Sequence, residues 1–385
     1  MSVFTYIAPC HFGLEAVLKR EVAKLGLEVL SVDDGRVVFA GNETDAARAN
    51  IGLRSAERIL IRAGEFRALT YDELFEGTKA IPWEEYLPKN AKFWPSKAAS
   101  VRSILFSPSD IQSIVKKAMV ERMKTRYRVE WFPEDGPSYP VRVSIKKDVV
   151  TIGLDTTGTS LHKRGYRVSP VMAPVSETLA AGIIGLTPWF PDRILVDPFC
   201  GSGTIPIEAA MIAKRIAPGL KRHFLSEDWT GLIRAADWKK AREEAQAQIL
   251  TDALADTDIQ GYDIDARAVK AARENAEAAG VRELIHFQQR AVKELRHPKK
   301  YGFIITNPPY GERLEDRAGL PALYRQIGEA YGSLDSWSMY LITSYEDAEK
   351  YIGRKADRNR KIYNGMLKTY LYQYMGPKPL RNGKR

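Results

Sequence analysis

The chain has 385 residues, which suggests two or three domains that are each large enough to bury a core. Hydrophobic residues make up 44% and charged residues 28%, which excludes long disorder; no apolar run reaches the roughly 18 residues of a membrane span, and the first twenty residues lack the order of a signal peptide, so we expect a cytoplasmic protein. Lys and Arg total 58 against 48 Asp and Glu, and this net charge of +10 favours a polyanionic partner.

The first part of the chain, up to about residue 165, mixes helical and strand patterns. Residues 13–26 carry leucine and valine at helical spacing and stop at a glycine, so they predict a helix. Residues 35–41 then predict a strand, and residues 139–158 alternate as strands. We expect a small α+β unit here.

Residues 107–128 predict a second helix, which has a basic surface. Ser107 suits the N-cap position, and Pro108 suits the first helical position. Six basic side chains project away from its apolar stripe: Lys116, Lys117, Arg122, Lys124, Arg126 and Arg128. Such a face is either an ordinary solvated helix surface or a patch that contacts phosphates.

From about residue 166, strands alternate with helices, which is typical of a doubly wound parallel sheet. Five strands are predicted within residues 193–199, 258–264, 284–290, 301–307 and 338–344. Helices are predicted after the first two strands, and the second helix stops at Gly280. Asn364 and Gly365 between β-rich flanks predict a hairpin, so we expect an antiparallel pair to close the sheet.

A glycine turn links the first predicted strand of this region to its helix. Gly201 and Gly203 allow a sharp turn and a close approach to a ligand, and the helix behind them presents free N–H groups. Pro206 stands where a dinucleotide fingerprint needs its third glycine. The next acidic strand end, Asp263, also lies much farther from Asp197 than the usual spacing of about 20 residues. A pyrophosphate cofactor is therefore disfavoured.

A ligand with a nucleoside and a zwitterionic tail but no phosphate suits these residues better. Asp197 would repel phosphate, yet it could attract an ammonium or sulfonium group. Asp263 stands where Rossmann-like folds carry the carboxylate that accepts two ribose hydroxyls. We expect Asp265 to cap the helix that follows.

The two cysteines, Cys10 and Cys200, have no Cys or His near them at metal-ligand spacing, so no metal site is expected. Cys200 lies in the glycine turn, where we expect it to pack.

Three segments in this order and spacing, DPFCGSGT, GYDIDARAVKAARENAEAAG and NPPYGER, resemble class I S-adenosylmethionine-dependent methyltransferases of the amino-methylating type. The resemblance covers residues 166–375 and implies S-adenosylmethionine as the cofactor and S-adenosylhomocysteine as the product. It implies twelve cofactor-binding residues: Glu177, Thr178, Asp197, Phe199, Cys200, Gly201, Gly203, Thr204, Asp263, Ile264, Ala291 and Asn307.

Three of these positions need comment. By analogy with the family, Glu177 and Thr178 close the methionine end of the cofactor pocket, although helix capping explains both residues equally well. Ala291 stands where such enzymes commonly carry an acidic residue for the adenine amine. The adenine contact must therefore come from the backbone or from another side chain.

The segment from Thr306 to Arg313 follows a buried-strand pattern and contains Asn307 and two prolines. An exocyclic amine on a nucleobase is a poor nucleophile, because its lone pair is delocalised into the ring. If the Asn307 side-chain carbonyl and the Pro308 main-chain carbonyl each accept one N–H, the lone pair is directed toward the methyl donor. The prolines stiffen the loop, and Tyr310 offers a face for an extruded base. We predict a catalytic loop formed by Asn307, Pro308, Pro309 and Tyr310.

The N-terminal half carries a second resemblance. Residues 107–124, 141–158 and 160–167, the last reading SLHKRGYR, are similar to the THUMP-containing RNA methyltransferases. In that family a ferredoxin-like segment and a THUMP domain capture structured RNA, and the methyltransferase domain modifies guanine N2. The resemblance covers nearly the whole chain and is closest to the bacterial enzymes that make N2-methylguanosine in 23S ribosomal RNA.

Five basic residues are predicted to contact RNA: Lys116, Lys117, Lys163, Arg164 and Arg167. The last three cluster at the junction between two predicted modules. They would either contact RNA there or form an interdomain linker of salt bridges.

The predicted fold class is α/β, with a C-terminal Rossmann-like methyltransferase sheet that is doubly wound and ends in an antiparallel hairpin, preceded by α+β ferredoxin-like and THUMP domains. The predicted boundaries are residues 1–65, 66–165 and 166–385. The predicted activity is methyl transfer to guanine N2 in 23S ribosomal RNA or its precursor, without a metal or a membrane. Three alternatives stay open: the same chemistry on tRNA, adenine-N6 methylation of DNA, and a non-catalytic RNA-binding assembly factor.

Overall fold

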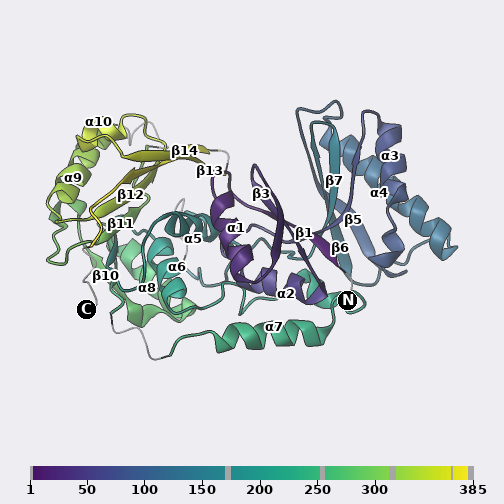
Figure 1. The fold of residues 1–385 in the computed structure, drawn as a ribbon, viewed down its shortest axis with the longest axis horizontal. Helices are drawn as coiled ribbons and strands as arrows, with labels where there is room; N and C mark the ends of the chain where they lie inside the picture. The colour runs from purple at the N-terminus through teal and green to yellow at the C-terminus, as the bar shows by residue number, and fades with distance from the viewer. Residues whose placement is uncertain (1–2, 170–174, 252–255, 312–317, 366, 380–385) are drawn as a thin grey trace, which may run out of the picture. The chain divides into compact units, whose positions relative to one another are not determined.

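The structure is a computed structural model that describes residues 3–169, 175–251, 256–311, 318–365 and 367–379 (Figure 1). The chain forms two compact units. The first unit contains residues 1–9, 21–161 and 222–244, and the second contains residues 10–20, 162–221 and 245–385. Helices α1 (Glu15–Lys24) and α7 (Ala235–Ala247) are each divided between the units. Within the part that the structure describes, no helix is long and apolar enough to cross a membrane.

The first unit is built on a seven-stranded sheet with the order β2-β3-β1-β4-β7-β6-β5. Its strands are β1 (Phe4–Pro9), β2 (Glu28–Asp33), β3 (Arg36–Gly41), β4 (Leu60–Arg67), β5 (Lys92–Val101), β6 (Ser138–Lys146) and β7 (Val149–Asp155). β5 and β6 are parallel, and the other neighbouring strands are antiparallel. Its helices are α2 (Glu43–Gly52), α3 (Tyr71–Ala80) and α4 (Pro108–Tyr127), with 3-10 turns at Trp83–Glu85 and Leu225–Asp228.

Helix α4 follows the sequence prediction closely. The Ser107 hydroxyl accepts the Asp110 N–H at 3.4 Å, and Pro108 is the first helical residue. Most of the predicted apolar stripe is buried, with Ile111, Val115 and Met119 fully inaccessible. Local capping and apolar periodicity therefore suffice to define this helix.

Residues 222–244 pack within the first unit, although in sequence they lie between two elements of the second. The Trp229 ring stacks on Tyr139 with centroids 4.4 Å apart, and its indole N–H donates to the Ser138 carbonyl at 2.9 Å. Asp237 accepts the Thr44 hydroxyl at 3.0 Å. This segment therefore belongs to the first unit, although in the sequence it comes after the domain boundary that is predicted near residue 165.

The second unit is built on a seven-stranded sheet with the order β10-β9-β8-β11-β12-β14-β13. Its strands are β8 (Leu195–Asp197), β9 (Ile259–Asp263), β10 (Ile285–Gln289), β11 (Phe303–Thr306), β12 (Ser338–Thr343), β13 (Arg358–Asn364) and β14 (Leu367–Tyr374). The first five strands in this order are parallel, while β14 runs antiparallel to both β12 and β13. The predicted doubly wound sheet and closing hairpin are confirmed.

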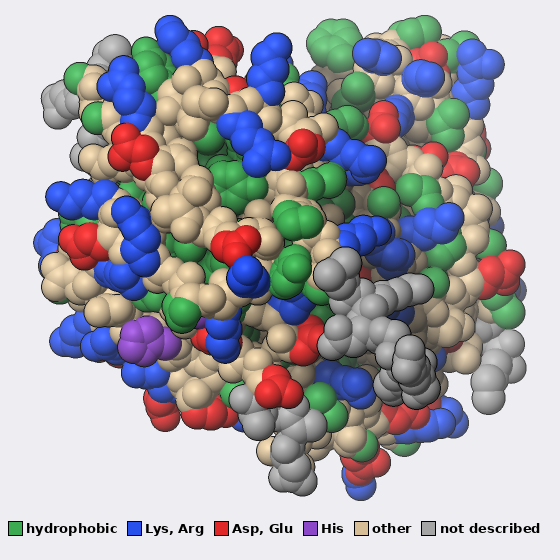
Figure 2. All heavy atoms as spheres, turned by 60° about the vertical axis from the view of Figure 1, so that its left-hand side comes forward, with side chains coloured by type: hydrophobic (Ala, Val, Ile, Leu, Met, Phe, Trp, Pro, Cys, Tyr) green, Lys and Arg blue, Asp and Glu red, His purple; other side chains and the backbone are tan. Residues whose placement is uncertain are grey.

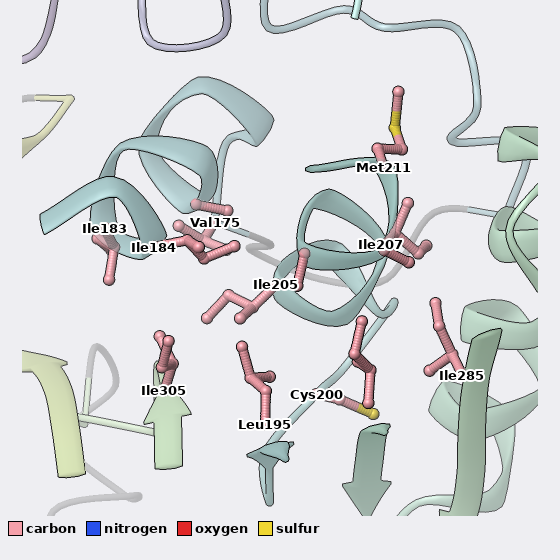
Figure 3. Close-up of a cluster of buried hydrophobic side chains, with 14 of the residues drawn as sticks. Val175, Ile183, Ile184, Leu195, Cys200, Ile205, Ile207, Met211, Ile285 and Ile305 are labelled. Atoms are coloured by element: carbon pink, nitrogen blue, oxygen red, sulfur yellow. The ribbon is translucent and has the colours of Figure 1, made fainter. Parts of the chain in front are cut away.

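Helices cover both faces of this sheet. They are α5 (Glu177–Leu186), α6 (Thr204–Ala213), α8 (Ala266–Ala279), α9 (Leu320–Gly332) and α10 (Ala348–Ile352), with 3-10 turns at Arg282–Leu284 and Val292–Glu294. Successive residues of β8 enter different cores: Leu195 packs with α5, α6 and α8, whereas Val196 packs with α9 and α10. Figure 3 shows the first of these cores, with Ile205 of α6 lying between α5 and the sheet.

Residues 10–20 belong to this second unit. The Leu14 side chain is fully buried in the core with α5, and a Cβ on Gly182 would overlap it. The His11 ring contacts the Tyr363 carbonyl at 2.9 Å, and Arg360 donates to the Gly13 carbonyl at 3.2 Å. Residues 10–14 therefore contact β13 and contribute Leu14 to the core of the second unit.

Candidate active site

The site is built where the carboxyl ends of β8 and β11 meet. Strand order reverses between these two neighbours, and crevices in doubly wound sheets form at such a switch point. Asp197 ends β8, and its Oδ1 accepts the hydroxyl of Thr306, the last residue of β11, at 2.6 Å. The same oxygen accepts the Phe199 N–H at 3.1 Å. The loop that starts at Asn307 therefore leaves the sheet next to the segment that leads into the glycine turn.

The glycine turn has the backbone that its residues predict. Gly201 has φ +52° and Gly203 has φ +83°, in the left-handed region that favours glycine. A Cβ on Gly203 would lie 3.0 Å from the Cβ of Ala272 and 3.1 Å from the ring of Phe287. Around a Cβ on Gly201, no described atom lies within 4 Å, so one side of the turn faces open space. Thr204 opens α6 directly behind the turn.

Asp263, at the end of β9, holds the other side of the turn. One carboxylate oxygen accepts the Gly201 N–H at 3.0 Å, and the other accepts the Asp265 N–H at 2.9 Å. Each oxygen keeps a second lone pair, so two further donors can bind. The neighbouring Ile264 side chain is 73% exposed, which is unusual for a large aliphatic residue at a sheet edge. Asp265 caps α8 through the Arg267 N–H at 2.8 Å, as predicted.

At the start of α5, the capping role belongs to Ser176, whose hydroxyl accepts the Leu179 N–H at 3.4 Å. Glu177 and Thr178 are buried at the first two positions of the helix. The Glu177 carboxylate pairs with Arg167 at 3.1 Å. Capping therefore does not account for Glu177 or Thr178.

The loop after β11 is anchored through the Pro309 carbonyl by a chain of hydrogen bonds that includes two hydroxyl groups. The Tyr345 N–H donates to Thr343 Oγ1 at 3.0 Å, and this hydroxyl contacts Tyr324 Oη at 2.6 Å. Tyr324 Oη in turn donates to the Pro309 carbonyl at 3.3 Å. In the described part of the chain, the half-buried Asn307 side chain has no hydrogen-bond partner, so its amide is available to a ligand.

The remaining residues of the predicted loop have mixed surroundings. Pro308 is buried, Pro309 is exposed and Tyr310 is half-buried. Glu312 and Arg313, which complete the NPPYGER motif, lie outside the described residues.

Two cofactor positions singled out by the sequence have clear environments. Cys200 is buried, and burial raises the pKa of its thiol well above the usual range, so the thiol stays protonated and packs in the core. Ala291 follows β10 at the start of a 3-10 turn, where its side chain offers no hydrogen bond. The Gln289 amide donates to the Ile264 carbonyl at 3.0 Å, which brings a polar side chain to this edge.

The five basic residues predicted to contact RNA fall into two groups. Lys117 and Lys163 are exposed, whereas Lys116 is partly buried, pairs with Glu134 at 2.9 Å and lies over the Phe93 ring. The Arg164 side chain is 1% exposed and pairs with Glu208 at 3.4 Å. Arg167 donates to four acceptors inside the second unit. Neither arginine suits the RNA contact predicted from the sequence, because each guanidinium is engaged within the protein.

Three further residues shape the site and were not predicted from the sequence. Thr306 and Tyr324 were not singled out, although each hydrogen-bonds a predicted site residue. Asn275 of α8 donates to the Ser202 carbonyl of the glycine turn at 3.1 Å. Its signal was a polar residue on the buried face of an amphipathic helix, one position from Ala276.

Comparisons with known proteins agree with this geometry. Residues 164–373 match the family of RMKL-like methyltransferase domains (UPF0020), residues 5–60 match the RlmL ferredoxin-like domain, and residues 68–155 match the THUMP domain. The chain belongs to this family of methyltransferases. The family and the fold class predicted from the sequence are thereby confirmed.

Three relatives are similar over nearly their full length. The Bacillus subtilis (strain 168) protein named "Putative RNA methyltransferase YpsC" is 48% identical, over 97% of this chain and 96% of that protein. The crystal structure of SMU.472, "a putative methyltransferase complexed with SAH", is 43% identical with a TM-score of 0.91, over 98% of this chain and 100% of that one. A Listeria monocytogenes structure named a "predicted N6-adenine-specific DNA methylase" is 47% identical with a TM-score of 0.90, over 98% of this chain and 97% of that one.

The residues present fit S-adenosylmethionine, the methyl donor of this methyltransferase. The two spare lone pairs of Asp263 match two ribose hydroxyls, and the exposed Ile264 side chain offers an apolar surface to the adenine. Buried carboxylates at Asp197 and Glu177 favour a cationic group nearby. When bound, the cofactor supplies an electrophilic methyl group on a positively charged sulfur.

Burial raises the pKa of Asp197 to about 7 from its ordinary value of 3.8, and the nearby Asp263 adds to this effect, while the Thr306 and Phe199 hydrogen bonds oppose it. The folded state is therefore more stable when Asp197 is protonated than when it is ionised. This stabilisation is complete below about pH 4 and is lost as the pH rises through about 7.

We predict that Asp197→Asn removes this pH dependence, because the amide oxygen can still accept from Thr306 and Phe199 without carrying a charge. From about pH 5 to about pH 7, the free energy of unfolding of the cofactor-free wild type should fall by about 2 kcal/mol relative to the variant. Urea unfolding across this range measures the difference. Parallel curves for the two proteins would contradict the prediction.

Proposed function

We propose that this protein transfers a methyl group from S-adenosylmethionine to the exocyclic N2 amine of a guanine in 23S ribosomal RNA or its precursor. The observation that carries the proposal is the Thr306–Asp197 hydrogen bond of 2.6 Å, because it places the Asn307 loop at the same sheet edge as the glycine turn. A base held by the loop and a donor held by the turn would then react directly, without a covalent intermediate.

In this proposal the loop orients the amine. The Asn307 side-chain carbonyl and the Pro308 main-chain carbonyl each accept one N–H, which directs the nitrogen lone pair toward the methyl group. Tyr310 stacks on the extruded base. The Tyr324 phenol, which donates to the Pro309 carbonyl, keeps the loop from moving when the base enters.

The choice of RNA rests on the THUMP domain at residues 68–155 and on the name of the Bacillus subtilis relative. A net charge of +10 suits a polyanionic substrate, and Figure 2 shows Lys and Arg side chains spread over the surface among acidic ones. We propose that Lys117 of the first unit and Lys163 of the second, which are both exposed, contact RNA phosphates, and that the partly buried Lys116 does so as well. The choice of guanine N2 as the target atom and of 23S ribosomal RNA as the substrate rests on the resemblance to the bacterial enzymes that make N2-methylguanosine in this RNA.

Two alternatives keep the same chemistry. One is tRNA as the substrate, because THUMP-containing methyltransferases also act on tRNA. The other is adenine N6 in DNA, which the name of the Listeria relative suggests. The Asn307 loop suits any exocyclic amine, so the polymer has to be identified by experiment.

Mass-spectrometric mapping of total RNA from a strain lacking the protein tests the proposal. Loss of one N2-methylguanosine in 23S ribosomal RNA, restored by the purified protein with S-adenosylmethionine, is the expected result. A modification missing from tRNA or DNA instead would select an alternative. Normal nucleic acids together with intact S-adenosylhomocysteine binding would favour the non-catalytic assembly factor.

A further inference from the structure

The Arg167 guanidinium makes four contacts around the glycine turn. Its Nε donates to Glu177 Oε1 at 3.1 Å, and one terminal nitrogen donates to the Ser202 hydroxyl at 3.3 Å. The other terminal nitrogen donates to the Thr204 hydroxyl at 3.1 Å and to the Val175 carbonyl at 3.2 Å. One planar group therefore joins the start of α5 to both sides of Gly203, and a planar fork of donors suits this task better than a point charge.

Burial makes this arrangement sensitive to the loss of any partner. The Arg167 side chain is 17% exposed, and the Glu177 side chain is 5% exposed. A buried carboxylate is costly unless a cation and hydrogen bonds accompany it. Among the described cations, Arg167 is the one that pairs with Glu177. Arg167 therefore compensates the buried carboxylate of Glu177, a residue that the family resemblance assigns to the cofactor.

The opposite side of the same chain segment is fixed as well. The Asn275 side-chain carbonyl accepts the Val168 N–H at 2.9 Å and the Ser169 N–H at 3.0 Å. Its amide group donates to the carbonyls of Ser169 at 3.2 Å and Ser202 at 3.1 Å. Residues 167–169 are thus attached to α5, to the glycine turn and to α8, which leaves the Arg167 guanidinium little freedom to turn outward.

We propose that Arg167 is a positioning residue for the cofactor site: it holds Glu177 and the glycine turn in the arrangement that binds S-adenosylmethionine. The proposal depends on the cofactor and is independent of the RNA substrate. It replaces the RNA contact that the basic segment SLHKRGYR suggests for this residue. The two assignments differ in what they predict for cofactor and RNA affinity.

Isothermal titration calorimetry of S-adenosylhomocysteine with the full-length protein tests the proposal. Arg167→Met should weaken binding about tenfold, the effect of losing one charge-assisted hydrogen bond to the cofactor. Arg167→Lys should recover part of this loss, because it keeps a cation near Glu177 but cannot reach Ser202 and Thr204 together. The KM for S-adenosylmethionine should rise more than kcat falls, whereas RNA affinity and its dependence on salt should stay unchanged.

A double-mutant cycle separates positioning from a general loss of packing. If Arg167 acts through Glu177, the combined Arg167→Met and Glu177→Gln variant should bind S-adenosylhomocysteine more tightly than the sum of the two single losses predicts. Arg354→Met is the matched control, because Arg354 forms an exposed ion pair with Asp357 at 3.3 Å in the same unit. This control should leave cofactor affinity unchanged.

Two results would overturn the proposal. One is a folded Arg167→Met protein that binds S-adenosylhomocysteine as the wild type does. The other is weaker RNA binding by Arg167→Met, with a slope of log K against log salt concentration that is smaller by about one. That result would support the RNA contact instead. If Arg167→Met does not fold, Thr204→Val removes one acceptor while keeping the arginine, and unchanged cofactor affinity in that variant would equally reject the proposal.

Discussion

Asn307→Ala is expected to lower the rate of methyl transfer by about a hundred-fold or more, as does the loss of one oriented polar group in other active sites. The same change should leave the affinity for S-adenosylhomocysteine within about twofold of the wild type, because Asp197, Asp263 and the glycine turn remain in place. Single-turnover transfer to RNA and calorimetric titration of the product measure the two effects. The side chain has no hydrogen-bond partner among the described residues, so its removal leaves no buried group unsatisfied.

Asn359→Ala provides the matched control for this experiment, because Asn359 is an exposed asparagine on β13 of the same unit. It should change neither quantity. Equal losses of transfer and of cofactor affinity in Asn307→Ala would mean that Asn307 holds the cofactor and does not orient the amine. Full activity in that variant would reject the proposed catalytic loop.

The parts of the fold that local chemistry determines were predicted well. Helix α4 has a serine cap, a proline at its first position and a clear apolar stripe, and its ends lie where those residues place them. The central strands β8, β11 and β12 are buried along their whole length, as expected for strands covered by helices on both faces, whereas β10 at the sheet edge alternates between buried and exposed residues. Gly201 and Gly203 have the left-handed backbone that motivated their assignment.

Long-range packing was not predictable from these patterns. Nothing local in residues 222–244 indicates that Trp229 stacks on Tyr139, which lies far earlier in the sequence. The same limit explains the arginines, because a basic segment has the same composition whether its side chains face solvent or buried carboxylates. Arg164 and Arg167 are engaged by Glu208 and Glu177, and those two residues carried no pattern that linked them to the arginines.

Asp263→Asn is expected to weaken S-adenosylhomocysteine binding by about a hundred-fold, although the two side chains have the same shape. Both carboxylate oxygens accept backbone N–H groups, from Gly201 at 3.0 Å and from Asp265 at 2.9 Å. An asparagine must turn its NH2 group toward one of these donors, so it loses that bond and one of the two ribose contacts. The ribose contact that is lost contributes about 1.5–3 kcal/mol, and the one that remains is no longer charge-assisted, so together the two changes correspond to about a hundred-fold in affinity.

Asp265→Asn, two residues further on, is the control for this prediction. Asp265 accepts the Arg267 N–H as the N-cap of α8, and asparagine is an equally good N-cap, so cofactor affinity should stay within about twofold of the wild type. Calorimetric titration of both variants with S-adenosylhomocysteine makes the comparison. If Asp263→Asn bound the product as tightly as Asp265→Asn does, the ribose would have to be held by another residue, and the carboxylate of Asp263 would serve only to shape the glycine turn.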